Sequence, residues 1–290
     1  MQRRTFIKNS TLLAFNVSVF GTLHWNGKSF EGDTPTTTDI LGPYYRPGAP
    51  MRTNLRLANS NGTPVVLKGC IFKEDGKTPI DKALVEIWHC DEHELYDNTS
   101  DEYKYRGKEM TKADGKYEFK SILPVPYKGG DFWRPAHFHL RVSVPNQQDL
   151  ITQIYFKGGK YIDTDPYASN PQAASRILNI TQNKSGESEV EFNVVMSKAF
   201  PLEPKVYDKL TGLYNAGGGY TCEFSKDDNL LFMKVNGQFW GALKYIGNNS
   251  FEGGSGAQKA SFELLADGGV KVVIESMGQS YSATKFLKYK

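Results

Sequence analysis

The chain has 290 residues, of which 39% are hydrophobic, so it can bury one large core or two modest ones, which argues against global disorder. Its formal net charge is +3, and without a cluster of lysine or arginine this mild excess excludes an obvious nucleic-acid partner. The three cysteines include no CxxC pair, which argues against a thiolate zinc site. Cys70 and Cys90 lie in two strand-like runs and are either bridged in an oxidising compartment or buried as free thiols.

The N-terminus has the pattern of an export signal. It begins MQRRTFIKNSTLLAFNVSVFGTL, in which a basic start precedes an apolar stretch too short for a comfortable membrane span. RRTFIK is similar to a twin-arginine signal, although Gln2 stands where Ser or Thr is usual. We expect residues 1–30 to be a leader for export to the periplasm or cell envelope. The alternative is an amphipathic N-terminal helix on a cytoplasmic protein, and no other transmembrane segment is expected.

From Pro64 the chain alternates short apolar runs with residues that are typical of turns. Ala83, Val85 and Ile87 fall on one face of a strand, and Asp114–Gly115 marks a turn between two others. Strands at this spacing predict an all-β fold, with an antiparallel β-sandwich over residues 31–203. The runs expected to be strands are PVVLKGCIF, ALVEIWHC, KYEFKSI, RPAHFHLRVSV, LITQIYF and SEVEFNVVM, and YASNPQAASRIL is expected to hold one short helix.

The segment FPLEPK at 200–205 carries two prolines and indicates a domain boundary. Beyond it, residue pairs typical of hairpin turns recur at Asp227–Asp228, Asn236–Gly237 and Asn248–Asn249. We therefore expect residues 206–290 to form a separate small β domain. It contains no histidine, and its sequence gives it no catalytic constellation.

The stretch DFWRPAHFHLRV, residues 131–142, holds two of the five histidines. Side chains alternate between the two faces of a strand, so Phe138 and Leu140 share a core face while His137 and His139 share the other. Two imidazoles at that spacing can converge on one metal ion. The alternative for such a pair is two solvent-facing histidines on a half-exposed sheet.

Two tyrosines and an arginine stand near this pair in the expected fold. Tyr96 follows the strand VEIWHC, and Tyr127 lies in a Pro/Gly-rich loop that leads into the histidine strand, so both can return to the same end of the sandwich. Arg134 lies directly upstream of the pair, where its charge can face an anion bound at a metal.

Residues 40–156 closely resemble the intradiol ring-cleavage dioxygenases, which are non-haem iron enzymes that open catechol rings between the two hydroxyls. The matching pieces follow one another in the family's order: GPYYRPGAP (42–50), ALVEIWHCDEHELY (83–96), TKADGKYEFKSILPVPY (111–127), WRPAHFHL (133–140) and LITQIYF (150–156).

The resemblance implies one Fe(III) per chain, held by Tyr96, Tyr127, His137 and His139. It implies a small catecholic substrate that reacts with O2 to give a cis,cis-muconate-type diacid. Tyr127 would be the axial ligand that the substrate displaces, opposite His139. Arg134 would stabilise negative charge on the ring.

The resemblance also suggests outer residues of the site. Gln153 matches a second polar residue near the reacting ring, with a solvent-paired strand residue as the alternative. Pro43, Tyr44 and Tyr45 are candidates to line the substrate pocket, with surface packing of the aromatics as the alternative. One position departs from the family: Glu94 stands two residues before the first tyrosine ligand, where a glycine is usual.

Other classes of protein share parts of this pattern. Transthyretin-like and carboxypeptidase-regulatory-like binding modules have the same strands and need no metal, but they have no use for two tyrosines and an H-x-H pair. A zinc hydrolase would need a carboxylate ligand and a general base, and neither is apparent. We expect an oxidoreductase without a nucleic-acid partner. A homo-oligomer is an alternative to a monomer, since members of the family often assemble.

Overall fold

The computed structural model describes residues 23–25, 30–32, 35–145, 147–197, 204–227, 230–254, 258–276 and 278–286. The expected leader falls mostly on residues 1–22, outside these ranges. Near it, only the backbone pairing of β1 (Leu23–Trp25) with β2 (Phe30–Gly32) is described. Among the described residues, no helix is long and apolar enough to cross a membrane.

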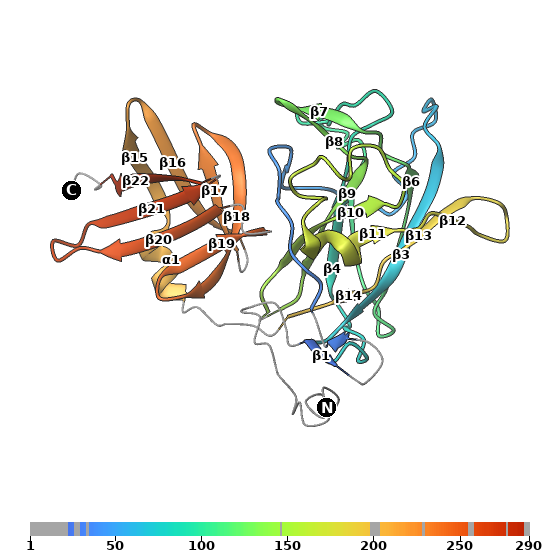
Figure 1. Ribbon diagram of the computed structural model, residues 1–290, viewed down its shortest axis with the longest axis horizontal. Coiled ribbons are helices and arrows are strands. Elements are labelled where there is room, and N and C mark those ends of the chain that lie inside the picture. The colour runs from blue at the N-terminus through green and yellow to red at the C-terminus, as the bar shows by residue number, and fades with distance from the viewer. Residues whose placement is uncertain are drawn as a thin grey trace, which may run out of the picture.

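The fold is all-β, as predicted, and its first part is built around two five-stranded sheets (Figure 1). One sheet has the strand order β11-β10-β9-β4-β5, and the other has β12-β13-β3-β14 with β6 also paired to β3. The strands of the first sheet are β4 (Leu84–Trp88), β5 (Arg106–Met110), β9 (His137–Ser143), β10 (Leu150–Phe156) and β11 (Ile177–Leu178). Those of the second are β3 (Pro64–Phe72), β6 (Lys116–Ile122), β12 (Thr181–Gln182), β13 (Ser188–Glu191) and β14 (Val194–Val195).

One core lies between the two sheets and follows the alternation of the strands. Ala83, Val85 and Ile87 belong to it, as do Phe138 and Leu140 on β9. Each of these side chains is fully buried, so the apolar faces that the alternation predicts are the faces that meet.

The expectation of purely antiparallel pairing needs a correction. The long pairs β9–β10, β4–β9 and β3–β6 are antiparallel, but β10–β11, β13–β3 and β14–β3 are parallel. Strands β11, β13 and β14 are short and come late in the chain, after a long connection from β10. A long connection leaves the direction of the returning strand free, whereas a tight hairpin fixes it as antiparallel. The expected short helix is a 3₁₀ helix, η1 (Pro171–Arg176).

The C-terminal part is a closed barrel, a form of small β domain that the sequence did not specify. Eight strands pair in chain order, and β22 returns to β15 through Tyr214 and Asn215. A short helix, α1 (Pro204–Leu210), precedes it and packs Tyr207 and Leu210 into the barrel core. The strands are β15 (Gly212–Gly217), β16 (Tyr220–Asp227), β17 (Leu230–Val235), β18 (Gln238–Gly247), β19 (Ser250–Gly253), β20 (Gln258–Leu264), β21 (Val270–Ser276) and β22 (Gln279–Lys285).

Two of the expected hairpin turns join neighbouring barrel strands. Asn236 and Gly237 have φ of 47° and 81°, and Asn248 and Asn249 have φ of 50° and 52°. Positive φ at both central residues is the requirement of a tight two-residue hairpin, and Asn and Gly meet it with the least strain. The expected turn at Asp227–Asp228 includes residue 228, which lies outside the described ranges.

The barrel lies against the first sheet (Figure 1). The segment that follows residue 35 runs between the two parts, and a buried cluster joins them there. From the barrel come Leu230, Phe232 and Ala242, and from the rest of the chain come Leu41, Tyr45, Trp88 and Ile151. The face of the first sheet that turns away from the core is therefore covered rather than exposed.

Candidate metal centre

Strand β9 places both histidines of the H-x-H pair on this covered face. His137 lies opposite Tyr155 of β10, and His139 lies between Gln153 of β10 and Trp88 of β4. Each histidine is only 1% exposed. The alternative of two solvent-facing histidines is therefore wrong. Alternation along the strand would leave this face exposed to solvent, but neighbouring segments bury it.

Tyr96 and Tyr127 both approach the histidine pair. Tyr96 lies in the loop after β4, and its hydroxyl is 3.4 Å from Nε2 of His137. Tyr127 begins β7 (Tyr127–Gly129), which pairs with β8 (Phe132–Arg134) just upstream of the histidines. The two phenol rings meet edge to face with centroids 5.4 Å apart, and the ring of Tyr127 lies 5.6 Å from that of His137.

The ring nitrogens of the two histidines point at each other. Nε2 of His137 and Nε2 of His139 are 3.2 Å apart. Nδ1–H of His137 donates to the carbonyl of Pro135 at 2.6 Å, which leaves its Nε2 with a free lone pair. Donors that share one transition-metal ion, each about 2 Å from it, lie about 3 Å from one another. The spacings of 3.2 and 3.4 Å therefore fit a single ion among these side chains.

Burial sets the protonation of all four groups. It lowers the pKa of His137 and of His139 well below the ordinary value, and the nearby Arg134 lowers both further. Burial raises the pKa of Tyr96 well above its ordinary value and raises that of Tyr127 to about 12, against the opposing effect of Arg134. The imidazoles are thus neutral donors. The phenols need a cation to ionise, which a bound metal provides.

The donor set favours a hard, highly charged ion. Within the described ranges, no group of three or more His, Cys, Asp or Glu side chains could hold a metal, so the donors beside the histidines are phenols. Anionic phenolate oxygens with neutral nitrogens suit a ferric ion. Catalytic zinc sites instead use combinations of His, Glu and Cys.

Arg134 is a buried cation fixed from two sides. Its Nε donates to Oδ2 of Asp165 at 2.6 Å, and one terminal nitrogen donates to Oε1 of Gln153 at 2.7 Å. Burial by itself lowers the pKa of Arg134, but the neighbouring Tyr127, Tyr155 and Asp165 outweigh it and hold that pKa above its ordinary value. Arg134 therefore keeps its positive charge next to Tyr127.

Gln153 is fixed by hydrogen bonds as well. Its Nε2 donates to the carbonyl of Ile40 at 2.8 Å, and the residue is fully buried. The alternative of a solvent-paired strand residue is wrong for this reason. Tyr155, two positions on and on the same face, donates its hydroxyl to Asp39 at 2.9 Å and lies 3.0 Å from Oε1 of Gln153.

Asp39, Tyr155, Asp165 and Arg176 were missed as parts of the site by sequence reasoning. A buried ion pair joins Arg176 to Asp39, and a second joins Arg134 to Asp165. Alternation along β10 could have revealed Tyr155, since it shares the face of Gln153. Asp39, Asp165 and Arg176 come from loops and a 3₁₀ turn, and no local pattern brings them to β10.

The three candidates for the substrate pocket lie in different environments in the structure. Tyr44 is half-buried and stacks on Tyr96 with centroids 4.4 Å apart, so it lies at the site. Pro43, the preceding residue, is exposed. Tyr45 needs a correction: it is 5% exposed and packs against Trp88 and barrel residues, because consecutive side chains of this segment point in different directions.

Two backbone positions support the site. Gly42 has φ of 74°, and a Cβ atom there would lie 3.2 Å from Cε1 of His139, so the loop passes close to this imidazole. Glu94 has φ of 69°, a left-handed conformation that glycine adopts without strain. The substitution of glycine by Glu94 thus leaves the turn before Tyr96 left-handed, at the expense of local strain.

His89, His93, Cys70 and Cys90 lie outside the donor set. His89 is buried and bonds the carbonyl of Cys90 and the hydroxyl of Ser121, both at 2.7 Å, so its expected structural role is confirmed. His93 is exposed. Cys70 and Cys90 are free thiols rather than a disulfide.

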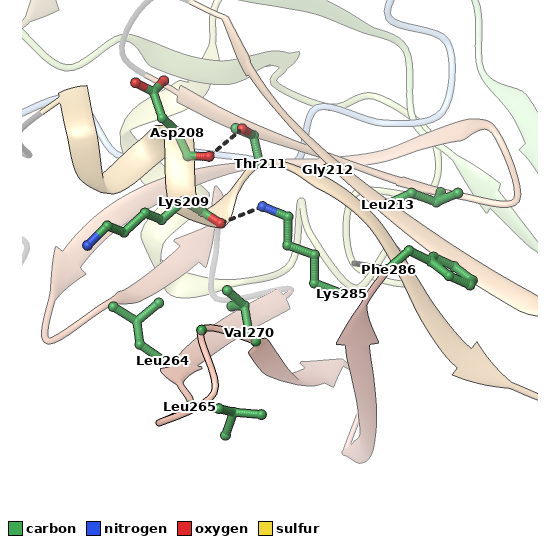
Figure 2. A pocket seen from close by; sticks show the side chains of 12 residues that line it. Asp208, Lys209, Thr211, Gly212, Leu213, Leu264, Leu265, Val270, Lys285 and Phe286 are labelled. Atoms are coloured by element: carbon green, nitrogen blue, oxygen red, sulfur yellow. Dashed lines mark hydrogen bonds between the residues drawn. The ribbon is translucent and has the colours of Figure 1, made fainter. Parts of the chain in front are cut away.

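A large open hollow lies elsewhere, at one end of the barrel (Figure 2). It has a volume of about 830 Å³ and is lined by α1, the start of β15, the β20–β21 turn and the end of β22. Nζ of Lys285 donates across it to the carbonyl of Lys209 at 2.6 Å. None of the four donors lines it, so size alone does not locate the chemistry of this chain.

Comparisons with known proteins point to one family. A family model described as Dioxygenase matches residues 40–198, more than half of the chain. The chain is 34% identical over 154 residues to a chlorocatechol 1,2-dioxygenase of Rhodococcus opacus, a match that covers 45% of this chain and 60% of that relative. It is 30% identical over 220 residues to a 6-chlorohydroxyquinol 1,2-dioxygenase of Cupriavidus pinatubonensis, covering 68% of this chain and 75% of the relative.

A solved structure shares this part of the fold. The dioxygenase domain of a dioxygenase carbohydrate-binding protein fusion from Streptomyces sp. SirexAA-E matches with a TM-score of 0.50 and 30% identity. That match covers 57% of this chain and 99% of the domain. The first of the curated relatives is matched over only about 60% of its length, and the barrel lies beyond the residues that the family model matches.

Proposed function

Since the chain belongs to the intradiol dioxygenase family, we propose that it is a non-haem Fe(III) enzyme that cleaves a catechol-type ring between its two hydroxyls. Both atoms of O2 would enter the product, a cis,cis-muconate-type diacid. The observation that carries the proposal is the convergence of two buried imidazoles and two phenols, with Nε2 of His137 lying 3.2 Å from His139 and 3.4 Å from Tyr96.

In this proposal Tyr96, Tyr127, His137 and His139 hold one Fe(III) per chain. When bound, the ferric ion supplies the electronic coupling that lets a closed-shell catecholate react with triplet O2. The neutral imidazoles contribute lone pairs, and the two phenolates offset part of the charge of the ion. His137, His139 and Tyr127 are buried, which limits competition from water and strengthens their interactions.

Tyr127 is proposed to receive a proton from the substrate. Burial raises the pKa of its phenol to about 12, so its Oη is a strong base once it is no longer shared with a cation. An incoming catechol must lose a proton before its oxygen can bind as an anion. Transfer of that proton to Oη of Tyr127 would neutralise this phenol and make room for the ring.

Arg134 is proposed to stabilise the negative charge that develops on the ring during cleavage. A fixed cation in a dry site needs no reorganisation when charge appears, which is the main advantage of such groups over water. Asp165 and Gln153 hold the guanidinium in place. Tyr44, stacked on Tyr96, is proposed to form part of the wall that the substrate ring contacts.

The relatives named above act on chlorinated catechols and hydroxyquinols, and we propose a substrate of the same catecholic class. The non-catalytic binding module is not favoured, because the family match and the buried donors both point to an enzyme. Export through the twin-arginine-like leader is proposed on its sequence pattern alone, and fractionation of cells that express the full chain tests it.

The test of the proposed activity is spectroscopic and kinetic. Protein expressed with ample iron is expected to be burgundy, because tyrosinate bound to Fe(III) absorbs in the visible range, and to contain one iron per chain. It is expected to consume O2 with a panel of catechols. A colourless, iron-free protein that consumes no O2 with any member of the panel would overturn the proposal.

A further inference from the structure

The two candidate histidine ligands are oriented by different means. Nδ1 of His137 bonds the carbonyl of Pro135, which fixes its ring. Nδ1 of His139 is buried and has no hydrogen-bond partner in the described part of the chain. Histidines that bind metals almost always use the second ring nitrogen in this way, so another interaction has to hold His139.

Stacking takes the place of that hydrogen bond. The imidazole of His139 lies parallel to the indole of Trp88, with centroids 4.8 Å apart and an interplanar angle of 6°. On another side, the backbone of Gly42 passes close to Cε1 of His139. Nε1 of Trp88 also has no hydrogen-bond partner among the described residues, so the indole too is positioned by packing.

Behind Trp88 the packing continues into the barrel. Tyr45 meets Trp88 edge to face at 5.0 Å, and the ring of Phe232 stacks on Tyr45 at 5.5 Å with an interplanar angle of 6°. Phe239 meets both Tyr45 and Phe232 edge to face. Phe232 and Tyr45 are 2% and 5% exposed, so these contacts form one buried series from β17 to the imidazole.

Polar contacts fix the same series. A terminal nitrogen of Arg141 donates to the hydroxyl of Tyr45 at 2.8 Å, and its Nε donates to Asp149 at 2.8 Å. The guanidinium also lies 5.6 Å from the ring centroid of Phe232. Gly254 of the barrel touches the other end of the site, because a Cβ atom there would overlap the carbonyl oxygen of Asp39.

We propose that the C-terminal barrel is a structural wall of the metal centre, and that Phe232 is a positioning residue for His139 through Tyr45 and Trp88. The inference rests on the proposed function for the identity of the ion. It gives residues 206–290 a role: the barrel holds a ligand ring that lacks a hydrogen bond of its own. The domain is thereby distinguished from a tethered module that moves independently.

The experiment compares Phe232→Ala, Phe232→Leu and Phe286→Ala in the full chain. Phe232→Ala removes the stacked ring, whereas Phe232→Leu keeps apolar bulk in the cluster. Phe286→Ala is the matched control, because Phe286 is also a barrel phenylalanine but is 49% exposed and lines the hollow at the barrel end. The readouts are the rate of iron loss to a chelator, and the hydrogen exchange of β9 amides in metal-free protein.

Phe232→Ala is expected to lose iron about tenfold faster or more, which is the usual effect of disturbing the support of a ligand. Its β9 amides are expected to exchange faster in the metal-free protein. Phe232→Leu should fall between this variant and wild type, and Phe286→Ala should match wild type. If Phe232→Ala retains iron and exchanges as wild type does, the inference is overturned.

The exchange measurement separates this inference from the proposed function. If wild-type protein binds no iron, the proposed function fails, but the exchange of β9 still shows whether the barrel supports His139. If Phe232→Ala does not fold, Phe232→Leu decides by the same two measurements. A Phe232→Leu protein identical to wild type in both would then overturn the inference.

Discussion

Gly42 and His139 are in close contact: a Cβ atom added to Gly42 would lie 3.2 Å from Cε1 of the imidazole. The same glycine has φ of 74°, a conformation that side chains rarely adopt. The loop that carries Tyr44 into the site therefore passes close to the imidazole of His139, and it does so at a residue without a side chain.

Replacement of this glycine tests the contact. Gly42→Ala adds a methyl group and left-handed strain together, which we expect to cost about 1–3 kcal/mol of stability and to displace His139. Urea unfolding and iron content would measure the two effects. Gly130→Ala provides the control, because Gly130 has φ of 72° but nothing within 4 Å of its Cβ position. Equal iron contents in the two variants would show that the contact with His139 does not matter.

Removal of the hydroxyl of Tyr127 should change colour and rate together. Tyr127→Phe keeps the buried ring but leaves no oxygen to bind the ion or to accept a proton. The visible band should weaken, and turnover should fall by about 10²-fold or more, within the range of lost acid–base catalysis. Tyr117→Phe is a suitable control, because Tyr117 is a buried tyrosine in the core between the sheets. Full activity of Tyr127→Phe would count against the ligand assignment.

Substitution of His137 should affect metal binding first. His137→Ala removes a donor whose partner, Nε2 of His139, lies 3.2 Å away, so we expect purified protein to retain no iron. Metal analysis and the visible spectrum provide the measurement. His93→Ala is the control, since His93 is an exposed histidine outside the proposed donor set. Retention of iron by His137→Ala would place the ion elsewhere.

The charge of Arg134 can be separated from its structural role. Arg134→Met should lower kcat by about 10²-fold if the guanidinium stabilises charge on the ring. It also leaves Asp165 buried without its cation, which is strongly destabilising. The double variant Arg134→Met/Asp165→Asn removes both charges and should regain much of the stability without regaining activity. Recovery of kcat in the double variant would show that Arg134 acts only through folding.

Stability should depend on pH through His89. Burial lowers the pKa of this imidazole to about 4, against about 6.5 in an unfolded chain. Between these values the unfolded chain binds the extra proton, so stability is full above about pH 6.5 and falls as the pH drops toward 4. The contribution is up to about 3 kcal/mol.

The measurement is urea unfolding of metal-free protein at several pH values between 4 and 7. His89→Gln removes the titrating group, so its stability should fall less steeply than that of wild type over this window. His137 and His139 titrate in both proteins, which means that the difference isolates His89. Parallel slopes for the two proteins would contradict the prediction.

The sequence by itself determined the local patterns. Alternation along residues 137–143 put Phe138 and Leu140 into the core and both histidines on the opposite face, and the structure has that arrangement. The positive-φ turns at Asn236–Gly237 and Asn248–Asn249 also follow from the residues alone. These features depend on neighbours within a few positions, which is the range over which backbone geometry acts.

Only the tertiary structure decided what covers each face. The sequence left the histidines either as a pair that could bind a metal or as two solvent-facing residues, and the loop after residue 35 together with the barrel buries them. The direction of Tyr45, the pairing of Arg134 with Asp165 and the closure of the barrel join residues far apart in the chain. Their physical cause is long-range packing and the pairing of buried charges, and a local pattern carries no information about which distant segment supplies the partner.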